Sequence, residues 1–519
     1  LMTHGAGRYV YVLGATSDLA RANFNNILAL GGAQPLLAGA RAYRFLSSVR
    51  DELGLELNSL SHDPDFASPG TLDFHLLSTA GRYLPGGAVT TDVRTSVLID
   101  AADPARTFAS EPGAQGGRLN LGLHGDSHQA SQSPTNARFT ALSYNDGGSV
   151  RGTNALRWIA YGAATGHLVA LQFTSDNGAT WTNIATGLAA ASGQYTQWNT
   201  TVHGAVPAAY WRVLSENDPA VWDTNDLPFT VNNGAITFYV NDGSTNGDVY
   251  TSTPGTNIYD GLTRDTPLPS VGAVLSRYLL AAGDRILVDT GTYPLNSPLA
   301  FDANIAGGIT NPVVLQGSTN LAAGGTVFEG PVGGSAITVA NRAVGLTLRN
   351  FTIRNAQAGI VMDGVTNCTI EDVQVRQAST LGSDAFGFDL NRSSNIVFRR
   401  CVATVITNSG NSGVGRGLRI LNSRSVVWLD GVMWSNSTAI EVSSSDLNVT
   451  NSIFAAFGSS NLVYRLQVGA TLRADYNNYW VRQNALVARV LDSYLIDILT
   501  PSLVAQRDYE SVAQWSRET

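Results

Sequence analysis

Short apolar strands recur through the second half of the chain at intervals of roughly twenty to thirty residues. The stretches "SAITVANRAVGLTLRNFTIRNA" and "AGIVMDGVTNCTIEDVQVRQA", which begin at Ser335 and Ala358, follow one scheme. A short apolar strand is followed by a polar turn, a second strand, a corner of Asn, Asp or Arg, and a third strand. Three short strands per repeat are typical of a parallel β-solenoid, because one coil cannot bury its apolar row without stacked neighbours.

The scheme predicts which residues lie above one another in successive coils. The expected first column is Ile337, Ile360, Phe386, Leu418, Ile440 and Val463; the second is Leu348, Ile370, Phe398, Trp428, Val449 and Leu472; the third is Phe351, Val373, Cys401, Val432, Ile453 and Tyr476. The expected corners at Asn350, Asp372, Asp430 and Asn451 carry residues that tolerate turn conformations. The longer spacing between Phe386 and Leu418 predicts a loop that leaves the coil over Thr407–Gly417.

Two similar stretches lie near opposite ends of the sequence. "GATSDLARANFNN" occupies Gly14–Asn26 and "GATLRADYNN" occupies Gly469–Asn478, which places Asn25 and Asn477 452 residues apart. We therefore expect residues 8–62 to repeat the register of residues 462–519. The spacing predicts a tandem array of solenoids with a period of about 450 residues.

A different pattern separates the two solenoid parts. "LRWIAYGAATGHLVALQFTSDNGATWTNI" has alternating strands around the turn Ser175–Gly178, which is typical of a β-hairpin. Five of the nine tryptophans fall in this region, and in a β-sandwich tryptophan is usually a core residue. We divide the chain into 1–134, the closing coils and exit segment of one β-helix unit; 135–233, a β-sandwich; and 234–519, the opening segment and coils of the next unit.

Several stretches resemble known families. The segment from "FYVNDGSTNGDVYTSTPG" to "DTGTY" (238–293) resembles the opening segment of the right-handed parallel β-helix (pectate-lyase-like) repeat domains of large bacterial surface and secreted proteins. Residues 73–134, beginning "DFHLLSTAGRY", resemble their exit segment, and "SDNGATW" is similar to Ig-like β-sandwich spacers. The resemblance implies an all-β chain in which right-handed parallel β-helix modules alternate with an Ig-like β-sandwich. It does not choose a function, since this fold serves lyases, hydrolases, adhesins and stalks.

The amino-acid composition excludes several classes of function. The formal net charge is −8 and charged residues make up 14% of the chain, so no basic field for nucleic acid is expected. A membrane-spanning helix needs about eighteen consecutive apolar residues, and no stretch of this sequence approaches that length. All 32 basic residues of the Lys+Arg total are arginine, which excludes lysine Schiff bases and lysine general bases. Cys368 and Cys401 are too few for a disulfide framework, and we expect both to be buried and free.

The loop that begins at Asp242 is a candidate calcium site. Asp242, Ser244, Asn246 and Asp248 place oxygen-bearing side chains at alternate positions around a glycine-containing turn, as calcium loops do. Thr253 stands where the twelfth, acidic ligand is expected, so Asp260 would have to supply that carboxylate. Calcium is therefore the cofactor expected for this loop. The alternative is a polar turn that caps the first strand of the solenoid.

Charged residues on the predicted strands would line a groove if they faced the same way: Arg349, Arg354, Glu371, Arg376, Asp389, Arg399 and Arg419. Polysaccharide lyases of the resembled fold use Lys or Arg as the base, and polygalacturonases carry Asn-Thr-Asp, Asp-Asp, Gly-His-Gly and Arg-Ile-Lys strings, none of which occurs here. No catalytic residue is therefore assigned, and solvated surface charge is the alternative interpretation.

Two functional hypotheses follow. The first is a structural module of a tandem-repeat extracellular fibre, stalk or giant adhesin, located outside the cell or on its surface. In this hypothesis the chain is not an enzyme, its partner is itself, head-to-tail through the β-helix ends, and it contacts surface polysaccharide. The alternative is a carbohydrate-active β-helix enzyme, a polysaccharide lyase or glycoside hydrolase, with an accessory β-sandwich. The recurrence over 452 residues and the missing catalytic motifs favour the first.

Overall fold

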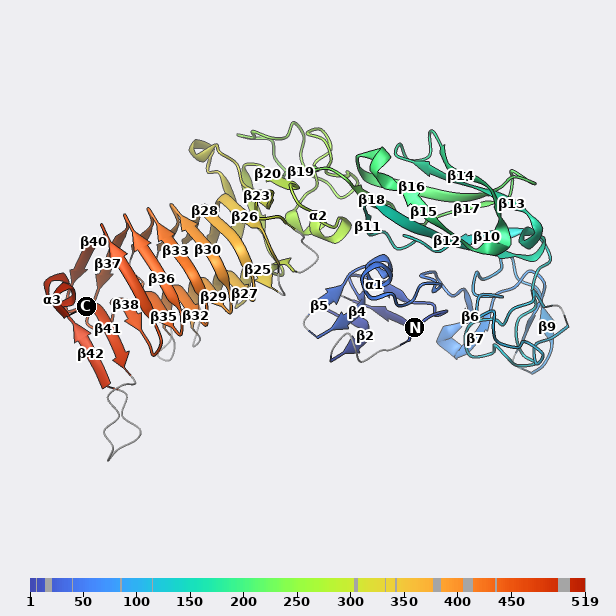
Figure 1. The fold of residues 1–519 in the computed structure, drawn as a ribbon, viewed down its shortest axis with the longest axis horizontal. Coiled ribbons are helices and arrows are strands. Elements are labelled where there is room, and N and C mark those ends of the chain that lie inside the picture. The colour runs from blue at the N-terminus through green and yellow to red at the C-terminus, as the bar shows by residue number, and fades with distance from the viewer. Residues whose placement is uncertain are drawn as a thin grey trace, which may run out of the picture. The chain divides into compact units, whose positions relative to one another are not determined.

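The computed structural model describes the chain except for residues 6, 15–20, 40, 85, 114, 303–306, 332, 341–342, 377–383, 405–413, 435, 493–504 and 519. The described residues form two compact units, Leu1–Gly234 and Ala235–Thr519, here called unit 1 and unit 2 (Figure 1). Their boundary lies one residue from the expected start of the second β-helix. The expected division at residue 134 stays a prediction. Most of the loop expected over Thr407–Gly417 lies outside the described residues.

Unit 2 is built from parallel strands that form three stacks, seen as successive rungs in Figure 1. Stack 1 contains β19 (Thr237–Val240), β20 (Arg285–Val288), β23 (Val313–Gln316), β26 (Leu346–Arg354), β28 (Thr366–Arg376), β30 (Ser394–Arg399), β33 (Arg424–Leu429), β36 (Asp446–Thr450) and β39 (Thr471–Asp475). Stack 2 contains β21 (Gly291–Pro294), β24 (Thr326–Glu329), the C-terminal halves of β26 and β28, β31 (Val402–Thr404), β34 (Val432–Trp434), β37 (Ile453–Phe457) and β40 (Asn478–Arg482).

Stack 3 is a separate sheet. It contains β22 (Leu299–Phe301), β25 (Ser335–Ala340), β27 (Ala358–Asp363), β29 (Ala385–Asn391), β32 (Gly415–Leu421), β35 (Thr438–Ser443), β38 (Leu462–Leu466) and β41 (Leu486–Asp492), and ends in the antiparallel β42 (Ala505–Tyr509). Helix α2 (Val271–Arg277) precedes the first full coil, and α3 (Val512–Glu518) follows the last strand. One coil therefore contributes one strand to each stack, which is the arrangement of a parallel β-helix.

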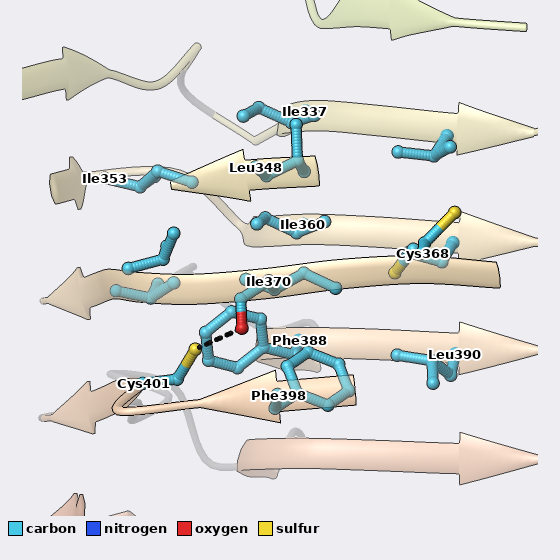
Figure 2. Packing of buried hydrophobic residues seen from close by; sticks show 14 of the residues in the cluster. Ile337, Leu348, Ile353, Ile360, Cys368, Ile370, Phe388, Leu390, Phe398 and Cys401 are labelled. Carbon is cyan, nitrogen blue, oxygen red and sulfur yellow. Dashed lines mark hydrogen bonds between the residues drawn. The ribbon is translucent and has the colours of Figure 1, made fainter. Parts of the chain in front are cut away.

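The core of unit 2 fills the space between the stacks. Ile337, Ile360 and Phe388 are register partners on successive strands of stack 3, and each is fully buried. Leu348, Ile370 and Phe398 form the corresponding row of stack 1. Figure 2 shows the side chains of these rows pointing into the same interior. Each coil thus buries its apolar row against its neighbours, as the sequence pattern predicts.

Some predicted columns were wrong by one or two residues. In column one, Ile360 pairs with Phe388 rather than Phe386, and Ile440 pairs with Tyr464 rather than Val463. A two-residue slip leaves the side chain on the same strand face, so the apolar pattern alone cannot distinguish Phe386 from Phe388. Column two continues to Ala474 rather than Leu472.

Column three departs further from its prediction. Val432 pairs with Val402, so it lies one residue beyond the row that contains Cys401. Ile453 and Tyr476, expected inside, are 46% and 80% exposed. The position after each corner is taken by Gly431 and Ser452 in these coils. Small residues carry no apolar signal, so the prediction took a bulky residue beside the inward position instead.

The two cysteines are buried and free. The Cys401 thiol donates to the Ile370 carbonyl oxygen at 3.3 Å (Figure 2). Burial raises the pKa of Cys368 to about 11 and that of Cys401 to about 12, so neither is a ready thiolate. Both act as small core residues.

Unit 1 begins with a small strand-and-helix segment. It contains β1 (Met2–His4), β2 (Tyr9–Leu13), β3 (Leu28–Leu30), β4 (Gln34–Ala38), β5 (Arg41–Tyr43), α1 (Leu46–Leu53), β6 (Phe66–Ser68), β7 (Asp73–Leu76), β8 (Arg82–Tyr83) and β9 (Val89–Thr90). β1 pairs with β3 and β2 with β4 in parallel, whereas β5 returns antiparallel to β4. A core around Ile27, Leu36 and Tyr43 holds this segment together.

The rest of unit 1 is mainly antiparallel. It contains β10 (Arg138–Ala141), β11 (Ser149–Val150), β12 (Thr153–Tyr161), β13 (Leu168–Thr174), β14 (Thr182–Ala189), β15 (Gln194–Asn199), β16 (Ala205–Ser215), β17 (Trp222–Thr224) and β18 (Phe229–Asn232). One sheet has the order β10-β12-β15 and the other β11-β18-β16-β13-β14, with β17 on β16. Trp158, Trp198 and Trp211 are core residues, whereas Trp222 is 49% exposed. The Ig-like character of this part stays a prediction.

The end of unit 2 has the same order of elements as the start of unit 1. In each, parallel strands are followed by an antiparallel return strand and a short helix: β4, β5 and α1 in unit 1, and β41, β42 and α3 in unit 2. Leu36 pairs with Tyr43, and Ala488, 452 residues after Leu36, pairs with Tyr509. Both tyrosines are buried. We call these two segments the closing segments.

Helices of the described residues are short. None combines the length and hydropathy of a segment that crosses a membrane.

Candidate functional site

A column of left-handed corners separates stack 1 from stack 2. The corner residues Asn350, Asp372, Arg400, Asp430, Asn451 and Tyr476 have φ values of 60°, 53°, 50°, 56°, 54° and 54°. Each corner turns the chain so that the next strand belongs to stack 2, and the corner side chain remains at the surface. Asn and Asp adopt this conformation more readily than other side chains, and the four Asn and Asp corners expected from the sequence are confirmed.

Charged side chains cluster along this column on the coils that contain β26, β28 and β30. Arg400 donates from Nε and Nη2 to the two carboxylate oxygens of Asp372, at 2.7 Å each. Glu371 lies 3.7 Å from Arg400 and 3.4 Å from Arg349. The Asp372 carboxylate raises the pKa of the Arg400 guanidinium, which therefore stays charged. Two carboxylates and two guanidinium groups thus share one part of the surface.

Polar contacts extend this cluster toward the start of the unit. Arg349 Nε donates to Gln316 Oε1 at 2.9 Å, and Gln316 Nε2 donates to the Tyr250 hydroxyl at 2.7 Å. Gln316, Arg349 and Glu371 are register partners on β23, β26 and β28. Their side chains are held in a row by strand pairing and by each other.

A groove of about 330 Å³ adjoins the cluster. One wall comes from the corner column and the strand residues beside it, and the other from the connection between β23 and β24. Most of the lining residues offer hydroxyl, amide or charged groups: Ser318, Thr319, Leu321, Gly324, Gly325, Thr326, Asn350, Phe351, Thr352, Asp372, Gln374 and Arg400. The lining therefore combines an apolar surface with several hydrogen-bonding groups, as ligand sites commonly do.

The charges expected to share a groove are divided by the structure. Arg349, Glu371 and Arg399 lie in one row beside the groove, and Arg354 and Arg376 lie in a parallel row on stack 2. Asp389 and Arg419 lie instead on stack 3, where Arg419 Nε donates to Asp389 Oδ1 at 2.8 Å. Sequence reasoning did not single out Gln374 or Arg400. The sequence signal that could have revealed Arg400 is that it occupies, in the next coil, the position equivalent to Asp372.

The predicted calcium ligands are only partly gathered. Asp242, Ser244, Asn246 and Asp248 share one loop, whereas Asp260 lies in a separate turn, where its Oδ1 accepts from Leu262 N and Thr266 Oγ1. Asp242 Oδ1 accepts from Ser244 N at 2.8 Å. Among the described residues, no three His, Cys, Asp or Glu side chains are grouped to hold a metal ion. Calcium binding by this loop stays a prediction.

A buried carboxylate that sequence reasoning missed organises the same loop. Asp289 is fully buried after β20, and its oxygens accept from the backbone N–H groups of Val249, Tyr250 and Thr251 at 2.6–2.7 Å. Burial and the nearby Asp289 carboxylate raise the pKa of Asp248. The Asp289 carboxylate therefore holds the backbone of this loop in place.

Comparison with known proteins identifies the fold of unit 2. Residues 335–486, from β25 to the start of β41, match the family described as the right handed beta helix region. This part of the chain is therefore a right-handed parallel β-helix, as the sequence resemblance implied. A search of curated proteins gave no match.

Two solved structures are similar to the chain. One is the crystal structure of an alginate lyase from Paenibacillus sp. str. FPU-7, with 14% identity over 39% of this chain and 92% of that chain and a TM-score of 0.25. The other is the catalytic domain of a GH87 alpha-1,3-glucanase in complex with nigerose, with 12% identity over 72% of this chain and 89% of that chain and a TM-score of 0.14.

These comparisons correct one expectation. The chain was expected not to be an enzyme, but the solved structures it resembles are a lyase and the catalytic domain of a glucanase. Motif strings of other β-helix enzymes were a poor basis for excluding catalysis. In the fold itself, chemical groups from different coils meet at one surface, as Asp372 and Arg400 do, without any continuous motif.

Proposed function

We propose that the chain is a carbohydrate-active enzyme that binds a polysaccharide across the groove beside Asp372 and cleaves a glycosidic bond there. The observation that carries this proposal is the groove of about 330 Å³, with hydroxyl and amide side chains in its lining and the Glu371–Arg400–Asp372 cluster at its edge. Sugar hydroxyl groups need hydrogen-bonding partners that are already held in place, and Asn350, Thr352 and Gln374 supply amide and hydroxyl groups there.

The cluster contains the groups that glycosidic cleavage requires. Hydrolysis uses two carboxyl groups, of which one protonates the leaving oxygen and the other activates water or attacks the sugar. Asp372 lines the groove, and Glu371 precedes it in the chain. In elimination from a uronate sugar a base takes the proton from C5, the C4–C5 double bond forms, and the leaving oxygen on C4 departs with a proton from water. The Asp372 carboxylate at the groove would be the base, and Arg349 and Arg400 carry the charge that neutralises the sugar carboxylate. The products distinguish the two reactions, since only elimination leaves a carbon–carbon double bond in the new chain end.

The test compares Asp372→Asn with Asp430→Asn in the full chain. Asp430 occupies the same corner column but does not line the groove, so its variant controls for the loss of one corner charge. We expect the wild-type chain to depolymerise at least one member of a panel of acidic and neutral polysaccharides. Asp372→Asn should lower kcat/KM by about 10²–10⁴-fold, whereas Asp430→Asn should retain activity.

Reducing-end assays and ultraviolet absorbance of unsaturated products measure the two possible reactions, and circular dichroism checks that both variants fold. The proposal fails if the wild-type chain cleaves no member of the panel, or if Asp372→Asn cleaves as well as Asp430→Asn.

A second proposal concerns assembly, and the repeated closing segment supports it. We infer that copies of the chain associate head-to-tail through β-helix ends, as part of an extracellular fibre or stalk. Among the described residues, β39 and β40 pair on one side only, with β36 and β37, and β1 and β2 likewise pair only with β3 and β4. Unpaired strand edges are templates for further pairing.

Unit 1 provides an example of how such an edge is covered. Ile27 N donates to Leu60 O at 2.8 Å, and Leu60 N donates to Asn25 O at 2.7 Å, beside the start of β3. A contact between different ends of identical copies is heterologous and gives an open filament rather than a closed dimer. Electron microscopy and light scattering over a concentration series should show polar filaments with a regular axial repeat. A constant mass of 54.8 kDa at every concentration would contradict this second proposal.

A further inference from the structure

Three aromatic rings form an exposed cluster on the outer face of stack 2. Trp434, Phe457 and Trp480 come from β34, β37 and β40, and their ring centroids lie 5.3–5.5 Å apart. Trp434 is 38% exposed and Trp480 is 43% exposed. The three rings are tilted by 61–84° to one another, so they pack edge to face and leave ring surface open to solvent. We call them the aromatic cluster.

The aromatic cluster continues a row that begins beside the groove. Strand pairing places Arg354, Arg376, Thr404, Trp434, Ala455 and Trp480 at equivalent positions of successive coils. Thr352 and Gln374, which line the groove, each lie two residues before an arginine of this row and so share its strand face. The five steps from Arg354 to Trp480 span about 24 Å at the usual strand spacing.

From Arg354 onward the row carries positive charge on a chain whose net charge is −8, whereas the register position before Arg354 holds Glu329. Arg354 and Arg376 are exposed, and Arg482 is exposed beside the cluster at the position that pairs with Phe457. Within the described part of the chain, none of these three guanidinium groups forms an ion pair with a carboxylate. Among the described residues, the hydrogen bond that Arg376 donates goes to the neighbouring Gln374. Unpaired cations next to exposed aromatic rings suit a ligand that offers both carboxylates and flat apolar faces.

We propose that this row binds an acidic polysaccharide, whose sugar rings stack on Trp434 and Trp480 and whose carboxylates meet Arg354 and Arg376. The inference rests on the proposed function in that the groove and the row share one face, and it extends that function by naming the class of substrate. A pyranose ring has an apolar C–H face that packs on aromatic side chains, and a uronate carboxylate pairs with guanidinium through charge-assisted hydrogen bonds. The length of the row accommodates several sugar units in an extended conformation.

Binding measurements on the full chain test this inference separately from cleavage. Polygalacturonate and alginate serve as acidic probes and dextran as the neutral probe, in affinity electrophoresis and isothermal titration with the Asp372→Asn background to prevent turnover. We expect the acidic probes to bind and dextran not to bind. Trp434→Ala/Trp480→Ala should weaken binding by about tenfold. Trp222→Ala, which removes a tryptophan of similar exposure from unit 1, should leave binding unchanged.

Salt dependence separates the two parts of the row. Arg354→Gln/Arg376→Gln should weaken binding at low ionic strength and flatten its dependence on salt, because screening acts on the charge contacts and not on stacking. The tryptophan variant should keep the wild-type salt dependence.

Three outcomes would overturn the inference. These are equal affinity for dextran and the acidic probes, unchanged binding by the double tryptophan variant, and a change in oligomeric mass in that variant without a change in binding. The third outcome would identify the aromatic cluster as an interface between copies of the chain. Binding without cleavage by the wild-type chain would leave the inference standing while the proposed enzymatic function fails.

Discussion

Corner residues set the shape of each coil through a single backbone conformation. The left-handed region is open to Asn and Asp at low cost, whereas a β-branched side chain clashes with its own backbone there. Arg400 and Tyr476 are the exceptions in the corner column, and the two hydrogen bonds of Arg400 to Asp372 link one coil to the next. Which residue can occupy a corner therefore depends more on the backbone conformations open to that residue than on its burial.

Asp430 offers a test of this dependence. Asp430→Val should destabilise unit 2 by roughly 1–2 kcal/mol, because valine must adopt a φ near 56°. Asp430→Asn removes the same charge but tolerates the conformation, so it should unfold close to wild type. Urea denaturation followed by the fluorescence of the buried Trp428 measures both. Equal stabilities of the two variants would show that the corner conformation does not limit stability.

Individual residues also show where sequence reasoning is limited. Asp372 and Asp430 were predicted as corners because only a few residue types, Asp among them, adopt a turn conformation at low cost. Trp434 and Trp480 were not recognised as surface residues, because an exposed aromatic residue has the same apolar signature as a buried one. The strand register reveals on which face a side chain lies. Loops of varying length between the strands make this register hard to derive from the sequence.

Between neighbouring strands of unit 2, buried serines link coil to coil. Ser423 N donates to Ser445 Oγ at 2.8 Å, and Ser393 N donates to Ser423 Oγ at 3.0 Å. The Ser423 hydroxyl donates in turn to the Leu421 carbonyl oxygen at 2.7 Å. These side chains satisfy backbone groups at the turns between stack 3 and stack 1, where regular strand pairing stops.

Removing one hydroxyl from this ladder should be costly. Ser423→Ala leaves the buried Ser393 N–H without its acceptor and should lower the free energy of unfolding by about 1–3 kcal/mol. Ser425→Ala is the control, since Ser425 is exposed and lies two residues further along, near the start of β33. Chemical denaturation of the two variants gives the comparison. If Ser423→Ala were no less stable than the control, water would have to replace the lost acceptor.

On the scale of the whole chain, the two units have separate hydrophobic cores. The core of unit 2 runs from Ile236 to Tyr509, and the cores of unit 1 lie within residues 27–231. We expect calorimetry to show two transitions, and the isolated fragment 235–519 to reproduce one of them at the same temperature. A single transition of the full chain that the fragment cannot reproduce would mean that the units fold as one.

The one-coil spacing of the register partners has a mechanical consequence. Leu418 and Ile440 are partners on adjacent strands although 22 residues separate them along the chain. A force that pulls the two ends of unit 2 apart along the stacking direction would peel strands away one coil at a time instead of shearing a whole sheet. Each peeled coil would lengthen the chain by about 70 Å, given about 3.5 Å per extended residue. Unit 2 would then yield as a stepwise extensible tether, and the size of each step would report the length of one coil.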